Sequence, residues 1–311
     1  MSNDIYYDND KLIIYNLKNS MCHFYDLMKN HKNLIIHSSY YQNIELPDDF
    51  KTKELIICYP FNQSIKLNKN LEILKIINYM FDKFLHLNEN LIVLEMTGDS
   101  YFNQHIDLNK NLHSLTLGYY FNKPLILNNK LEYLSIGNNF NQPIQLVESL
   151  KILKLGDSFN QPIELVKSLE ILILGYNFNQ PIELVESLIE LKLGNSFNQP
   201  IKLNEKLNQL KLGNSFNQPI QLVKSLEILE LGNNFNQPIE LSCDLYDVML
   251  CNYNYELTLN NKLQSLVLYD FNHNINLNEN LEFIVMSFNF NKLFICNKKL
   301  KSLIFGDEFN H

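Results

Sequence analysis

Hydrophobic and polar positions recur along this chain with a period close to 19 residues. In one unit, Leu150, Leu153 and Leu155 form an L-x-x-L-x-L run, and Lys154 stands between the last two leucines. Alternation of this kind predicts a short strand whose leucines face inward and whose lysine faces outward. The first half of each unit is therefore expected to be a strand with one buried face.

The second half of the same unit predicts a bend and another extended segment. Phe159 follows a turn rich in Gly, Asp and Ser, and Asn160 comes directly after it. Pro162 marks the next bend, and Ile163 and Leu165 alternate beyond it. We expect each unit to contain two short parallel strands, with an asparagine ladder that satisfies backbone groups between coils.

The Phe-Asn step identifies the repeat most clearly. Residues at the Phe position lie 18 to 21 residues apart from Tyr40 to Phe309, which is the period of a solenoid. A single coil cannot bury its own apolar face, so neighbouring coils must stack. The sequence predicts a mainly β solenoid of about 15 coils, whose structural core includes Phe140, Asn141, Phe159, Asn160, Phe178, Asn179, Phe197, Asn198, Phe216, Asn217, Phe235 and Asn236.

The two ends depart from the repeat. Residues 1–33 are expected to form an N-terminal cap, with a strand near Leu12–Tyr15 and a short helix near Cys22–Met28, and residues 34–311 to form the solenoid. The last residues stop partway through a coil without a polar cap. An open strand edge with apolar side chains invites pairing, so we expect end-to-end self-association through the C-terminal coil, or a partner bound there.

Composition narrows the classes of partner. The net charge is −8 and the chain contains no Arg, which disfavours nucleic acid as a ligand. Five widely spaced cysteines fit reduced thiols better than disulfides, and Cys296, at a position usually occupied by Leu, is expected in the core. No signal peptide or apolar membrane span is recognised, so we expect no membrane association and a cytoplasmic protein.

Catalytic and cofactor motifs are not found in the sequence. There is no glycine-rich nucleotide fingerprint, no metal-ligand spacing of histidines and no nucleophile elbow. Glu190 and Glu230 share the outward strand face with lysines, which is typical of a solvated face rather than of a pair of catalytic carboxylates. We therefore expect a protein that is not an enzyme and that has no cofactor or metal.

The outward row of the first strand is the candidate binding surface. Its middle is basic and its last positions are apolar, and contiguous exposed apolar area usually marks a contact surface. The alternative is that β-branched side chains simply favour strands. The candidate partner-binding residues are Lys154, Ile173, Lys192, Lys211, Met249, Val267, Phe283, Val285 and Ile304.

The unit resembles the FNIP repeat, a relative of the leucine-rich repeat. Copies such as Phe140 to Ile144 and Phe235 to Ile239 read F-N-Q-P-I, with Gln where the family signature has Ile. The resemblance implies a leucine-rich-repeat-like solenoid, and the family is typical of amoebae and of giant viruses that infect them. Some relatives carry an F-box, but residues 1–33 lack a convincing Leu-Pro-led pattern of that kind.

The sequence thus favours a protein-protein interaction scaffold that presents an extended repeat surface to an unknown protein partner. A repetitive structural or surface-adhesive protein is the alternative, and a substrate-binding part of a ubiquitin-ligase pathway is a further one. If the source is a virus, the expected compartment is the host cytoplasm.

Overall fold

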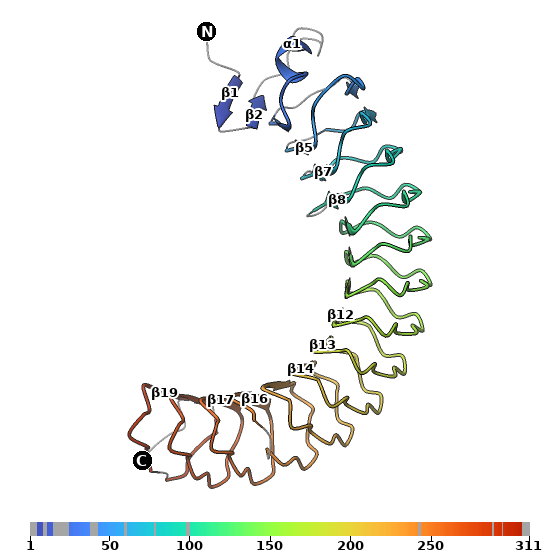
Figure 1. The fold of residues 1–311 in the computed structure, drawn as a ribbon. Coiled ribbons are helices and arrows are strands. Elements are labelled where there is room, and N and C mark those ends of the chain that lie inside the picture. The colour runs from blue at the N-terminus through green and yellow to red at the C-terminus, as the bar shows by residue number, and fades with distance from the viewer. Residues whose placement is uncertain are drawn as a thin grey trace. The chain divides into compact units, whose positions relative to one another are not determined.

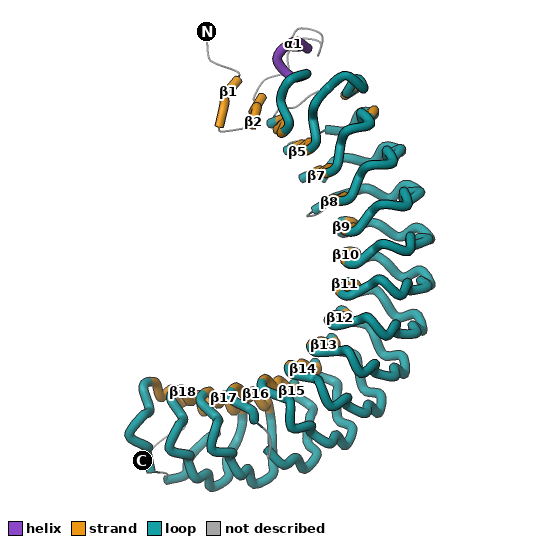
Figure 2. Tube along the Cα trace, in the orientation of Figure 1, coloured by secondary structure: helices purple, strands orange, loops and turns teal. Residues whose placement is uncertain are grey.

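A computed structural model describes residues 5–8, 11–14, 25–37, 43–58, 61–77, 79–97, 100–241, 244–287, 289–293 and 295–306 (Figure 1). The chain forms two compact units, Met1–Phe159 and Asn160–His311, called unit 1 and unit 2 below. Strands and loops make up nearly all of the described residues, as Figure 2 shows.

Unit 1 is a stack of coils that each contribute one strand to a parallel sheet. A short hairpin precedes the stack: β1 (Ile5–Asp8) pairs antiparallel with β2 (Lys11–Ile14), and β2 then pairs in parallel with β3 (Asn33–Ile36). The helix α1 (Tyr25–Met28) lies between β2 and β3 in the chain. The sheet continues through β5 (Glu54–Ile57), β7 (Ile73–Ile76), β8 (Val93–Met96), β9 (Ser114–Leu117), β10 (Tyr133–Ile136) and β11 (Ile152–Leu155).

Unit 2 repeats this arrangement. Consecutive strands pair in parallel and without a register shift, so that equivalent positions of the repeat lie side by side. Its strands are β12 (Ile171–Leu174), β13 (Glu190–Leu193), β14 (Gln209–Leu212), β15 (Ile228–Leu231), β16 (Asp247–Cys251), β17 (Ser265–Tyr269), β18 (Phe283–Ser287) and β19 (Ser302–Phe305). The predicted parallel β-solenoid is confirmed.

The segments before the first regular coils agree with the sequence in part. The strand expected near Leu12–Tyr15 is present as β2, and the expected helix is present as α1. The helix begins at Tyr25, while residues 22–24 lie outside the described part of the chain. A cap limited to residues 1–33 stays a prediction.

The phenylalanines form the centre of the core. Phe178, Phe197 and Phe216 are each 0% exposed, and their rings stack nearly in parallel with centroids 6.0 to 6.1 Å apart. Paired strands lie only about 4.8 Å apart. Successive coils therefore separate as the chain passes from the strand to the Phe position.

This separation explains why the second predicted strand is missing from most coils. The residues that follow Pro162 and its counterparts are extended loops, so the prediction of two strands in each coil is wrong. Coils that are separated more widely than paired strands cannot maintain a regular ladder, and proline has no N–H to donate. Among the described residues, the second extended segments pair only as β4 (Ile44–Glu45) and β6 (Ile65–Lys66). There the N–H of Ile44 donates to the carbonyl of Ser64 at 2.9 Å.

The asparagine after each Phe connects neighbouring coils. In unit 2, the side-chain oxygen of Asn179 accepts a hydrogen bond from the backbone N–H of Asn198, and Asn198 does the same for Asn217, both at 2.9 Å. In unit 1, Asp82 takes this place and accepts from the N–H of Asn103 at 2.9 Å. The bend backbone is thus satisfied by the side chain of the preceding coil, as buried polar groups require.

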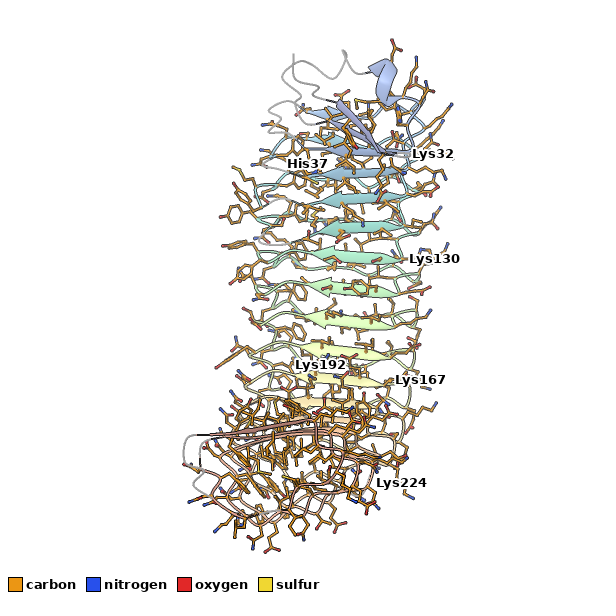
Figure 3. The ribbon with its side chains drawn as sticks, turned by 90° about the vertical axis from the view of Figure 1, so that its left-hand side faces the viewer. Lys32, His37, Lys130, Lys167, Lys192 and Lys224 are labelled. Atoms are coloured by element: carbon orange, nitrogen blue, oxygen red, sulfur yellow. The ribbon has the colours of Figure 1, made fainter. Side chains whose placement is uncertain are left out.

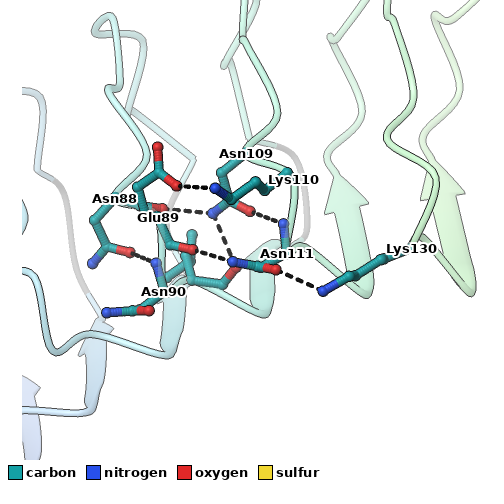
Figure 4. A network of polar contacts seen from close by, with 8 residues as sticks. Asn88, Glu89, Asn90, Asn109, Lys110, Asn111 and Lys130 are labelled. Atoms are coloured by element: carbon teal, nitrogen blue, oxygen red, sulfur yellow. Dashed lines mark hydrogen bonds and ion pairs between the residues drawn. The ribbon is translucent and has the colours of Figure 1, made fainter.

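A second asparagine stabilises the corner that leads into several of the strands, as Figure 4 shows for unit 1. The side-chain amide of Asn109 donates to the carbonyls of Asn88 and Leu91 at 2.6 and 2.9 Å, and its oxygen accepts from the N–H of Asn111 at 2.8 Å. Other coils use serine instead: the hydroxyl of Ser149 donates to the carbonyl of Leu131 at 2.8 Å. The chain therefore has two chemical solutions for the same corner.

Glycine at the end of the strand permits close contact between coils. A Cβ on Gly194 would lie 2.3 Å from the carbonyl oxygen of Gly175, and one on Gly213 would lie 2.6 Å from Gly194. In the coils of β16 and β17, Cys251 and Tyr269 replace this glycine and the turn is one residue shorter, with Asn252 at φ 54° and Asp270 at φ 55°. Asn and Asp are the side chains that best tolerate the left-handed region.

One core prediction is wrong. Cys296 is exposed rather than buried, and Leu293 and Ile295 in the same coil are 76% and 89% exposed. A repeat position becomes core only where a neighbouring coil covers it. No described residues cover this one.

Candidate functional site

The outward face of the parallel strands carries the side chains that the repeat leaves free. In most strands the second and fourth residues are buried and the first and third are half-buried, so each strand has a core side and an outward side. Figure 3 views this face and shows Lys192 of unit 2 on it. The alternation follows from the two-residue period of a strand.

The lysines predicted for this face all have partners. Lys192 pairs with Glu190 of its own strand at 2.5 Å, and Lys211 pairs with Glu230 of the next strand at 2.7 Å. In unit 1, the Nζ of Lys154 lies 5.6 Å from the centre of the Tyr133 ring, within cation–π range. The middle of the row in unit 2 is therefore closer to neutral than its lysines suggest.

The apolar residues predicted for unit 2 do come together. Met249 of β16 aligns with Val267 of β17, Val267 with Val285 of β18, and Val285 with Ile304 of β19. Phe283 lies on the same face between Ser265 and Ser302. We call these five residues, Met249, Val267, Phe283, Val285 and Ile304, the apolar strip.

Accessibility varies along the apolar strip. Ile304 is 49% exposed, whereas Val267 is 8% exposed despite its outward position. Met249, Phe283 and Val285 are half-buried. The accessible apolar surface therefore belongs mainly to the residues on either side of Val267.

Ile173 does not belong to the strip. It aligns with Lys192 on the neighbouring strand, and the row continues through Lys211 and Glu230 before it reaches Met249. Charged side chains thus separate Ile173 from the apolar strip.

A tyrosine cluster in unit 1 was missed in the sequence. Tyr79, Tyr101, Tyr119 and Tyr120 are 37% to 50% exposed. Their rings contact one another, with centroids 4.8 Å apart both between Tyr101 and Tyr120 and between Tyr119 and Tyr120. The available signal was the recurrence of Tyr in the turn just before the Phe position.

Burial and neighbouring charges shift the pKa of three groups near the strands. Burial raises the pKa of the Cys58 thiol, and burial together with Glu230 and Asp270 raises the pKa of Cys251. The Lys151 ammonium lowers the pKa of Glu132. Within the described ranges, no three His, Cys, Asp or Glu side chains gather as a metal site would require.

The described ranges contain one short helix, α1. No helix there combines the length and the hydrophobicity needed to cross a bilayer.

The comparisons with known proteins agree with this architecture. The FNIP repeat family model matches residues 140–176, 159–196 and 216–243. Among solved structures, CroV588, a giant-virus protein described as a novel circular LRR protein structure, matches with a TM-score of 0.62 and 26% identity. The match covers 99% of this chain but 55% of that one, so the chain spans about half the length of the structure it resembles.

A comparison with curated proteins gave no match. The resemblance predicted from the Phe-Asn-Gln-Pro-Ile copies is confirmed by the three matched segments. The solenoid thus carries FNIP repeats at residues 140–176, 159–196 and 216–243, and its fold resembles that of a circular LRR protein.

Proposed function

We propose that this chain is a non-enzymatic protein-interaction scaffold, and that the apolar strip of unit 2 is where it contacts a protein partner. The observation that carries the proposal is the strict register of Met249, Val267, Val285 and Ile304 on the outward face of four paired strands. Apolar side chains gathered on one open face usually mark a contact surface.

The surroundings of the strip support a protein partner. Tyr246, in the loop before β16, is 38% exposed, and Ser265 and Ser302 flank Phe283. An apolar centre with a tyrosine and hydroxyls around it has the composition of a protein-protein interface. The strip is held by a continuous backbone ladder, so little conformational entropy is lost when a partner docks.

The lysines of the same outward row do not extend the proposed contact beyond the apolar strip. Lys192 and Lys211 already have carboxylate partners, and a partner that displaced those pairs would gain little from them. We therefore leave Lys192 and Lys211 outside the proposed contact, although the sequence grouped them with it. Lys154 and Ile173 are left out as well, because Lys154 lies against Tyr133 and Ile173 is aligned with Lys192, away from the strip.

The test is affinity capture from cells of the native host with the wild-type chain and two variants. Ile304→Glu places a charge on the strip, while Ile126→Glu is the matched control on an 85% exposed side chain of unit 1. We expect Ile304→Glu to lose proteins that wild type and Ile126→Glu both retain. Equal recovery by all three chains would contradict the proposed surface.

A further inference from the structure

A second surface lies in unit 1, at the N-terminal ends of its strands. A groove of about 790 Å³ is lined there by residues that precede β3, β5, β7, β8 and β9. Its charged lining residues are Lys32, Lys51, Lys53 and Glu72. Figure 3 shows Lys32 at this end of the strands, with His37 of the same coil at the other end.

The groove is positive although the chain carries a net charge of −8. Lys53 forms an ion pair with Glu72. Neither Lys32 nor Lys51 has an ion pair with any described residue, so two ammonium groups remain free to meet a ligand. Three lysines against one glutamate leave the lining with a formal charge of two positive units.

At the N-terminal ends of the strands in unit 2, the balance of charge is the opposite. The groove there, of about 450 Å³, is lined by Glu227, Asp244 and Lys262 among other residues, and Lys262 pairs with Asp244 at 2.9 Å. Glu227 is left as the excess charge. The positive corner in unit 1 is thus a local feature of its sequence and not a property of the repeat.

A backbone ladder forms the floor of the unit 1 groove. The N–H of Lys53 donates to the carbonyl of Lys32 at 2.7 Å, and the N–H of Glu72 donates to the carbonyl of Lys53 at 2.8 Å. The same bond recurs from Ile92 to Glu72 and from His113 to Ile92, at 2.8 and 2.9 Å. Lysines that extend from this ladder start from fixed backbone positions.

Asparagines beside the floor add hydrogen-bonding groups. The side-chain amides of Asn70 and Asn90 donate to the carbonyls of Phe50 and Lys69, both at 2.7 Å. Their side-chain oxygens accept no hydrogen bond from the described residues, whereas the oxygen of Asn111 accepts from Lys130 at 2.8 Å (Figure 4). Asn70 and Asn90 therefore present acceptors in the same groove as Lys32 and Lys51.

We propose that this groove binds an extended acidic peptide segment of a partner protein, with its carboxylates on Lys32 and Lys51 and its backbone N–H groups on Asn70 and Asn90. The lining spans five paired strands, or roughly 19 Å at about 4.8 Å per strand. An extended peptide rises about 3.3 Å per residue, so about six residues fill it.

A peptide fits these groups better than a nucleic acid does. Backbone N–H groups recur at every residue of an extended peptide and match the asparagine oxygens, while a phosphodiester backbone has no such donors. Nucleic-acid binding also depends on many phosphate contacts, and the groove offers only two lysines outside an ion pair for them.

The experiment measures fluorescence anisotropy of labelled probes with the full chain at low and at physiological salt. The probes are a hexapeptide that alternates Asp and Ser, the same peptide with Asn in place of Asp, and a six-base thymidine strand. The variants are Lys32→Gln/Lys51→Gln and a control, Lys202→Gln/Lys224→Gln, which removes the same charge from two exposed lysines of unit 2. Circular dichroism checks that both fold.

We expect the Asp peptide to bind, its affinity to fall with salt, and the Lys32→Gln/Lys51→Gln variant to bind about tenfold more weakly than the control. The proposal is overturned if the Asp peptide fails to bind at low salt, if the Asn peptide binds equally well, if the control loses as much affinity, or if the thymidine strand binds more tightly than the Asp peptide.

Discussion

The side-chain oxygen of Asn198 accepts a hydrogen bond from the backbone N–H of Asn217, one coil further along the chain, at 2.9 Å. It lies 3.2 Å from the amide nitrogen of Gln218, which also donates to it. A single side chain therefore satisfies two donors of the next coil. This relation recurs through both units and connects the repeat signature to stability.

Two replacements of Asn198 should show how much of its contribution to stability comes from the accepting side-chain oxygen. Asn198→Ala leaves the N–H of Asn217 without its partner and is expected to cost about 1–3 kcal/mol of unfolding free energy. Asn198→Asp retains an acceptor, as Asp82 does in unit 1, and should cost less than half as much. Urea unfolding followed by circular dichroism measures both, and equal losses would show that the acceptor is not what matters.

Gly194 should not tolerate a side chain. In Gly194→Ala the new Cβ would fall 2.3 Å from the carbonyl oxygen of Gly175, so one coil must move away from the other. We expect a loss of at least about 2 kcal/mol, in the range of overpacked cores. Ser196→Ala, two residues later in the same turn, is the control, and a thermal melt in which the two variants behave alike would argue against close coil contact.

The asparagine corner and the serine corner should replace each other only when both of their positions are changed together. Asn128→Val removes the amide that donates to the carbonyl of Leu112 at 3.0 Å, and should cost about 1–3 kcal/mol. Adding Lys130→Ser introduces the hydroxyl that Ser149 provides in the next coil, and should recover most of the loss. A double-mutant cycle measures the coupling. Additive effects of the two changes would contradict this interpretation.

Replacement of Tyr253 should show how much its hydroxyl contributes to stability in addition to the stacked rings. Its ring lies parallel to that of Phe235 with centroids 6.3 Å apart, and its hydroxyl accepts from the N–H of Ile239 at 3.2 Å. Tyr253→Phe keeps the stack but loses the hydrogen bond, so we expect a loss of about 0.5–1.5 kcal/mol.

Tyr253 should also make the free energy of unfolding depend on pH in the alkaline range. Burial raises the pKa of Tyr253 above its usual 10.0, the N–H of Ile239 opposes this, and Tyr255 adds to it. The neutral phenol is thus favoured in the folded state, and its contribution is complete below pH 10 and decreases as the pH rises from there towards the folded pKa. Tyr253→Phe should reduce this alkaline loss in urea melts; an unchanged profile would exclude Tyr253 as its source.

Cysteine labelling should follow accessibility and pKa. Cys296 is exposed, whereas Cys58 and Cys251 are half-buried and burial raises the pKa of both thiols. A raised pKa lowers the thiolate fraction near neutral pH, so both should react more slowly than Cys296. Time-resolved alkylation with peptide mass spectrometry gives the order, and faster labelling of Cys58 or Cys251 would contradict it.

The core and the register follow from the repeat because both depend on local periodicity. Leu153 and Leu155 are buried and Lys154 faces outward, as a period of two requires. The missing second strands depend instead on the spacing between coils, which the 6 Å separation of rings such as Phe197 and Phe216 reveals. A sequence does not state that spacing.

The candidate site was only partly readable for a similar reason. The alignment of Met249 with Val267 and Val285 follows from counting residues along the repeat. The pairing of Lys211 with Glu230 and the burial of Val267 depend on side-chain conformations in neighbouring coils, which the pattern does not contain. The lysine groove of unit 1 gathers residues from five coils, and none of them is unusual in its own repeat.

The most direct test of the central claim places a photo-crosslinking amino acid on the apolar strip. The group replaces Met249 or Ile304 in turn, and Ile126 of unit 1 as the control, and the chain is irradiated in cells of its native host. We expect Met249 and Ile304 to crosslink to the same protein and Ile126 not to crosslink to it. Crosslinks from Ile126 to that protein, or none from either position of the strip, would contradict the central claim.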